Sequence, residues 1–136
     1  MSSTKLKLLS FLMIKKEKTT LVEKLAQVVV HGMQEKKAHD ITLLDLRNIG
    51  SSVSDFFVVC HANSPLQVDA IAKSVEEEVF KAFSQESWRK EGLTQGEWVV
   101  LDYVDVVVHI FIAEKRDYYG IEDLWADAEL IDIKSA

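Results

Sequence analysis

The residues best suited to chemistry in this sequence are Gly50, Ser51 and Asp55, which precede an apolar run that begins at Phe56. A Gly-Ser turn ahead of a strand with paired carboxylates is typical of nucleotidyltransferases, which hold two metal ions about 4 Å apart. The second carboxylate would stand at position 57, and Phe57 cannot bind a metal. The pattern therefore predicts at most a residual metal-dependent nucleotidyltransferase or hydrolase that uses Asp55.

Other catalytic patterns are missing from the sequence. It contains no glycine-rich dinucleotide fingerprint, no phosphate-binding loop, no Cys-x-x-Cys motif and no His pair at metal-ligand spacing. A Ser-His-Asp arrangement stays open, because His61 could approach Asp55 or Ser64 and serines are plentiful between positions 51 and 54. We expect no enzymatic activity, no metal and no cofactor.

Two apolar stretches, residues 98–101 and 106–112, predict strands joined by a tight turn, because both are rich in β-branched and aromatic residues. Strands that are apolar on both faces belong in the centre of a sheet. With a two-residue loop at positions 103 and 104, Asp102 would lie opposite Asp105. The two carboxylates are then either ordinary turn residues or an acidic recognition edge.

The same register places Trp98 opposite His109. Two interpretations of His109 stay open. It is either a packed imidazole with its hydrogen bonds satisfied or a donor at a binding edge.

Composition limits the class of protein. The chain has 136 residues, 48% of them hydrophobic, and no run of about 18 apolar residues that could span a membrane. We expect one soluble domain. The single cysteine, Cys60, lies in an apolar run and should be buried, and a reducing compartment fits. We expect the cytoplasm of a bacterium, and an organelle stays open as the alternative.

Acidic residues concentrate in the C-terminal third. From residue 97 onward there are ten acidic and three basic residues, a net charge of −7, whereas the whole chain carries −6. This charge argues against a nucleic-acid backbone as the partner of this region and favours a basic protein. An ordinary solvated surface explains part of the acidity equally well.

The first half of the chain predicts a helix and two strands. Thr20 and Glu23 match a capping box, so we expect a helix to begin at Thr20. Residues 1–18 form a basic and apolar leader that we expect to be loosely ordered. The apolar residues at helical spacing after Thr20 are Leu21, Leu25, Val28, Val29 and Met33. The strands are expected at residues 41–46 and 56–60.

The second half predicts a helix that begins after Ser64, with Pro65 in its first turn, and runs to about residue 83. A short strand near residues 86–91 and the central hairpin follow. After the hairpin we expect two short helices separated at Gly120, and residues 129–133 form either an edge strand or a mobile end. The prediction is a single α/β domain over residues 19–128, with one mixed sheet of about five strands flanked by helices and a C-terminal tail at 129–136.

Several segments in this order match a known family. They are residues 40–47, 51–60, 63–64, 67–68, 70–72, 91–92, 96–103 and 105–111, together with Tyr119, Glu122, Leu124 and Trp125. On these segments the chain resembles the ribosomal silencing factor family, RsfS, also called Iojap-like. The resemblance covers about residues 20–127, and the block from Trp98 to Phe111 is its most specific part.

The resemblance implies an α/β fold related to nucleotidyltransferases but without their catalytic carboxylate pair, in agreement with Phe57. It also implies binding to the large ribosomal subunit through a basic ribosomal protein, the fourteenth of the large-subunit series. Such binding blocks association with the small subunit when nutrients run low. The implied function needs no covalent chemistry, and we expect neither a membrane nor a sequence-specific nucleic acid as a partner. A homodimeric scaffold is a third interpretation of the chain, besides the silencing factor and the residual enzyme.

For the partner surface implied by this function we expect carboxylates and aromatic anchors in the hairpin and the short helices. The expected residues are Trp98, Asp102, Tyr103, Asp105, His109, Tyr119, Leu124 and Trp125. One departure from the family pattern lies among them. Family members usually have Gly where Val104 stands, so the turn is either of another type or strained at Val104.

Overall fold

The structure, a computed structural model, describes residues 3–50 and 54–133, without the side chains of residues 3–6, 11–12 and 14–19. Its helices are α1 (Ser3–Glu35), α2 (Pro65–Phe83), α3 (Ala113–Tyr119) and α4 (Ile121–Leu124). Its strands are β1 (His39–Asp45), β2 (Phe56–Ala62), β3 (Arg89–Glu91), β4 (Trp98–Asp102), β5 (Val106–Ile112) and β6 (Glu129–Asp132).

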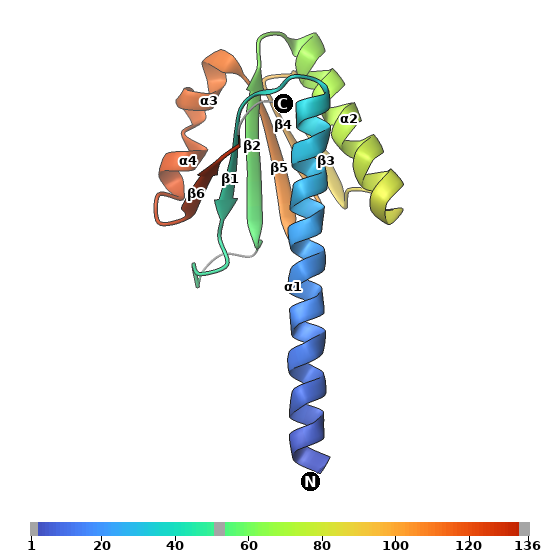
Figure 1. The fold of residues 1–136 in the computed structure, drawn as a ribbon. Coiled ribbons are helices and arrows are strands. Elements are labelled where there is room, and N and C mark those ends of the chain that lie inside the picture. The colour runs from blue at the N-terminus through green and yellow to red at the C-terminus, as the bar shows by residue number, and fades with distance from the viewer. Residues whose placement is uncertain (1–2, 51–53, 134–136) are drawn as a thin grey trace.

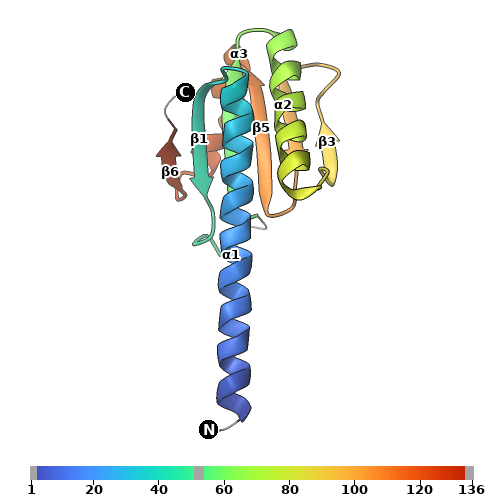
Figure 2. The same cartoon turned by 45° about the vertical axis from the view of Figure 1, so that its right-hand side comes forward.

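The strands form one mixed sheet in the order β3-β4-β5-β2-β1-β6. Among the described strands only β2 and β5 pair in parallel, and the chain between them includes α2, as a parallel connection requires a crossover. Helices α1 and α2 cover one face of the sheet, and α3 and α4 lie on the other (Figures 1 and 2). The predicted mixed sheet flanked by helices is confirmed, with β6 as a sixth, edge strand.

The first helix differs from its prediction. It begins at Ser3, so the predicted start at Thr20 is wrong. No Gly or Pro occurs between Ser3 and His31, so nothing in the sequence ends a helix before Thr20. The N-terminal part of α1 extends well beyond the sheet (Figure 1), and Leu21 is exposed although it fits the apolar spacing. Within the described residues, no helix is both long and apolar enough to cross a membrane.

Helices α1 and α2 pack closely through a glycine. A Cβ atom on Gly32 would lie 2.8 Å from the Cα of Val75, so only glycine allows this approach. The hydroxyl of Ser74 donates a 2.7 Å hydrogen bond to the carbonyl of Gly32. The prediction for α2 is confirmed, because Ser64 caps it by accepting a hydrogen bond from the N–H of Gln67.

The predicted hairpin exists, but its register is shifted. Trp98 pairs with Phe111 and Asp102 with Val107, so neither the Asp102–Asp105 pair nor the Trp98–His109 pair is directly opposed. The reason is that the N–H of Tyr103 bonds to the carbonyl of Val106, which moves the two-residue turn one position later. Each partner moves two positions along β5, so Trp98 and His109 still share a face of the sheet, whereas Asp105 falls in the turn.

Candidate interaction surface

Four partly exposed aromatic residues gather on the sheet face that carries α3 and α4. We call them the aromatic surface, and they are Phe57, Trp98, Tyr119 and Trp125. The rings of Trp98 and Tyr119 are 4.7 Å apart between centroids, and those of Phe57 and Trp125 are 5.6 Å apart. The residues come from β2, β4, α3 and the position after α4, so the complete fold is needed to assemble them.

Two buried rings of β5 connect the halves of the aromatic surface. Phe111 stacks on Trp98 with ring centroids 5.1 Å apart and planes at 24°. His109 meets Phe57 edge to face at 4.7 Å and accepts a 3.1 Å hydrogen bond from the indole N–H of Trp98. Burial lowers the pKa of His109 to about 3, so the imidazole is neutral near pH 7.

Strand alternation explains this arrangement. Side chains two apart on a strand share a face, which places Trp98 on β4 beside His109 and Phe111 on β5. On β2 the same face carries Phe57, which pairs with Val107. Phe57, which stands where a nucleotidyltransferase would carry its second metal-binding carboxylate, therefore contributes a ring to this surface.

The structure brings together four of the residues that the sequence predicts for the partner surface, namely Trp98, His109, Tyr119 and Trp125. His109 is buried, so it is a packed imidazole, but its Nε2 has no hydrogen-bond partner among the described residues, so its hydrogen bonds are not all satisfied. Leu124, on α4 next to Trp125, is 78% exposed.

The turn after β4 places the two predicted carboxylates differently. Asp102 accepts a 2.7 Å hydrogen bond from the N–H of Val104, which is the ordinary turn role of an aspartate. Asp105 accepts, through its backbone carbonyl, hydrogen bonds from the N–H groups of Asp55 and Phe56. This contact ties the turn to the start of β2.

Tyr103 lies apart from the aromatic surface. It is 2% exposed and belongs to the core on the face covered by α1 and α2. Burial, and then the charge of Glu76, raise the pKa of its phenol. A side chain in this position is inaccessible to a partner that binds at Trp98.

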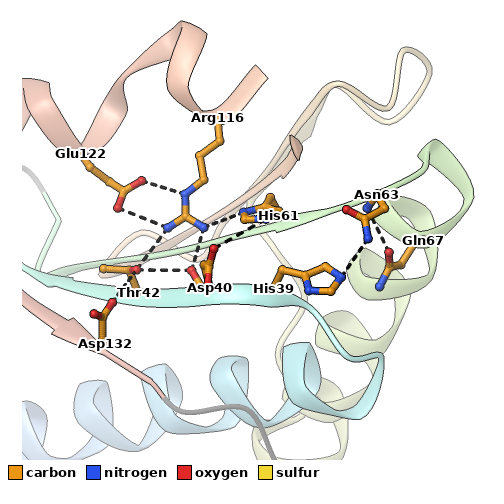
Figure 3. Close-up of polar contacts among 9 residues, drawn as sticks. All are labelled: His39, Asp40, Thr42, His61, Asn63, Gln67, Arg116, Glu122 and Asp132. Atoms are coloured by element: carbon orange, nitrogen blue, oxygen red, sulfur yellow. Dashed lines mark hydrogen bonds and ion pairs between the residues drawn. The ribbon is translucent and has the colours of Figure 1, made fainter. Parts of the chain in front are cut away.

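A polar network that the sequence did not predict surrounds Arg116, which is 8% exposed (Figure 3). Its Nε and Nη2 atoms donate to the two oxygens of Glu122 at 2.8 and 3.2 Å. The other N–H groups donate to the Asp40 carbonyl, the Thr42 hydroxyl and Nδ1 of His61 at 2.7, 3.1 and 2.9 Å. All five guanidinium donors are thus used, and they tie α3 to β1 and β2.

No signal in the sequence distinguishes this arginine from a surface residue of a short helix. The network borders a polar hollow of about 610 Å³ that is also lined by Asp117 and Asp132. Burial, and then the charge of Arg116, lower the pKa of His61.

The described positions give little support to the Ser-His-Asp arrangement or to a metal-dependent enzyme. His61 lies against Arg116 and 3.8 Å from a carboxylate oxygen of Asp40, at the opposite end of β2 from Asp55. The Ser51 of the predicted Gly-Ser turn falls outside the described residues. Across residues 3–50 and 54–133, no three His, Cys, Asp or Glu side chains gather as metal ligands would.

Comparisons with known proteins agree with the resemblance. A protein-family model described as ribosomal silencing factor during starvation matches residues 19–136. The ribosomal silencing factor RsfS of Halalkalibacterium halodurans is 39% identical over 112 residues, which are 82% of this chain and 94% of that protein. The chloroplastic protein Iojap of Zea mays is 35% identical over 100 residues, which are 73% of this chain and 42% of that protein.

Two solved structures also resemble this chain in fold and sequence. A crystal structure of a Chromobacterium violaceum protein has a TM-score of 0.73 at 31% identity and covers 85% of this chain and 95% of its own. A Bacillus halodurans structure has a TM-score of 0.69 at 37% identity, with 82% and 99% covered.

Proposed function

This chain belongs to the ribosomal silencing factor family, and we propose that it binds the large ribosomal subunit and prevents the small subunit from joining. The contact is made with a basic ribosomal protein, the fourteenth of the large-subunit series. The action is steric and breaks no covalent bond. Its proposed location is the cytoplasm, where free subunits associate.

The observation that carries this proposal is the aromatic surface. Phe57, Trp98, Tyr119 and Trp125 are partly exposed and held by the sheet, and exposed Leu124 adjoins them. Large side chains fixed in this way are the anchors that usually dominate the binding energy of protein interfaces. A rigid apolar surface of this kind favours a protein partner over a small substrate.

Charge supports a basic partner. The C-terminal third of the chain has a net charge of −7, and it supplies α3, α4 and the hairpin turn. Asp123, which precedes Leu124 on α4, is exposed and so available to such a partner. Opposite charges on the ribosomal protein would accelerate the encounter and orient the complex.

The mechanism follows from mass action. A protein that occupies the joining face of the large subunit withdraws that subunit from association in proportion to its concentration and affinity. No conformational change of the bound protein is needed. Translation is repressed for as long as the complex persists.

A subunit-joining assay with the purified protein tests this proposal. The wild-type protein should lower the yield of joined ribosomes as it is titrated in, and Trp98→Ala and Asp123→Lys should weaken both this effect and co-sedimentation with large subunits. Trp88→Ala is the matched control, because Trp88 is exposed but lies outside the aromatic surface. Unimpaired joining at saturating wild-type protein would exclude the proposed function.

A further inference from the structure

The hydrogen bond between Trp98 and His109 determines the tautomer of the histidine. The indole Nε1 of Trp98 lies 3.1 Å from Nδ1 of His109. An indole N–H can only donate, so Nδ1 is the acceptor and the imidazole proton resides on Nε2. Toward Trp98, His109 therefore acts as a neutral acceptor.

The other ring nitrogen lacks such a contact. Nε2 of His109 is buried and has no hydrogen-bond partner in the part of the chain that the structure describes. The neighbouring ring of Phe57, edge to face at 4.7 Å between centroids, has no polar atom to accept this hydrogen bond. Burying an N–H group without an acceptor costs free energy, so an aliphatic side chain would suit the stability of the fold better. The distinctive contribution of His109 is the bond that it accepts.

That bond gives Trp98 a direction that ring packing alone does not. Phe111 stacks on one side of the indole, and Tyr119 lies 4.7 Å away. Such contacts fill space but restrict rotation only loosely, whereas an N–H···N bond fixes the edge of the ring. A side chain that is ordered before binding spares the entropy that ordering would otherwise cost the complex.

We propose that His109 is the positioning residue of the aromatic surface, where it holds the Trp98 indole in the orientation that the partner meets. The binding part of this inference rests on the proposed function. The orientation of Trp98 can be measured in the free protein, without any ribosome.

Two substitutions of similar size separate this role from stability. His109→Asn retains an acceptor oxygen near the position of Nδ1, and His109→Leu removes it. In ¹H–¹⁵N spectra, the Trp98 indole proton should stay near its wild-type shift in H109N and move upfield in H109L. Trp98→Phe assigns this signal by removing it. In urea, H109L should be at least as stable as H109N, because leucine buries no polar group.

The affinity of the two variants for large subunits should follow the opposite order to their stability. In co-sedimentation with purified large ribosomal subunits, H109L should bind about three- to tenfold more weakly than wild type, which corresponds to the cost of ordering one side chain. H109N should bind more tightly than H109L. In a Trp98→Phe background, the exchange of His109 for Leu should cause no further loss.

The outcomes are distinct. An unchanged Trp98 indole shift in H109L, or affinities that follow the order of stability, would overturn the positioning role. If wild-type protein fails to bind large subunits, the proposed function is excluded, and the indole shift in H109L still decides whether His109 orients Trp98.

Discussion

The carboxylate of Asp102 accepts a 2.7 Å hydrogen bond from the backbone N–H of Val104, and this bond holds a β-branched residue at a φ of +72°. The N–H of Asp105 bonds to the carbonyl of Tyr103 at 3.0 Å, which closes a three-residue turn around Val104. The hydroxyl of Ser54 donates to the Val104 carbonyl at 2.9 Å. Surrounding contacts thus impose a backbone conformation that valine avoids.

Val104→Gly should therefore stabilise the protein by about 1 kcal/mol, since relief of the strained φ outweighs the added freedom of the unfolded chain. The side chain is 56% exposed, so little packing is lost. Urea unfolding gives the free energy of unfolding. Val104→Ala is the control and should lie between valine and glycine. A less stable glycine variant would show that Val104 is not strained.

The buried neutral His109 should make the stability depend on pH. Its pKa is about 3 in the folded state against an ordinary value of 6.5, so below pH 6.5 the unfolded chain binds a proton that the folded protein refuses. The free energy of unfolding then has its highest value above pH 6.5 and decreases as the pH drops toward 3. Between pH 6 and 4, the wild-type slope should exceed that of H109L by about 1.4 kcal/mol per pH unit. Parallel curves for the two proteins would mean that His109 titrates normally in the fold.

The close approach of α1 and α2 predicts a large cost for Gly32→Ala. The added Cβ would lie 2.8 Å from a backbone atom of Val75, so the helices must separate. We expect a loss of about 2 kcal/mol in the free energy of unfolding. Gly50→Ala is the control, since its Cβ would meet no atom of the described residues within 4 Å, and the stability of this variant should barely change. If Gly32→Ala were as stable as Gly50→Ala, the packing described for α1 and α2 would be contradicted.

Removal of the Arg116 guanidinium should destabilise the fold by about 2–3 kcal/mol, because Glu122 and the Asp40 carbonyl lose charged hydrogen bonds. Arg116→Met keeps most of the side-chain volume and is the appropriate variant. Lys115→Met, at the neighbouring position of α3, should change stability by no more than about 0.5 kcal/mol. Thermal unfolding of both variants distinguishes the buried network from general loss of charge.

The elements set by local pattern were predictable from the sequence. The cap at Ser64, the break at Gly120 and the two strands of the hairpin appear where the sequence indicates. The start of α1 did not, because a capping box at Thr20 has no effect when the preceding residues also favour a helix. The predicted register was wrong because Tyr103 bonds to Val106, which places the two-residue turn at positions 104 and 105. Val104 then has a positive φ, which is the strain that the missing glycine had left open.

Of the aromatic surface, Trp98, Tyr119 and Trp125 were predicted from the sequence, and Phe57 was not. Strand alternation places Trp98 and His109 on one face, and this held despite the shifted register. The same alternation puts Tyr103 on the opposite face, where the core buries it. The network of Arg116 joins residues more than 70 positions apart, and no local pattern signals such a contact.

The pairing of β6 with β1 brings together the last and the first strands of the sheet, and the N–H of Ile133 bonds to the carbonyl of Ile41 beyond it. During synthesis, one backbone edge of β1 therefore stays unpaired until residues 129–132 have been made. A nascent chain stalled before that point would present an open edge to other polypeptides, which is a known route to aggregation.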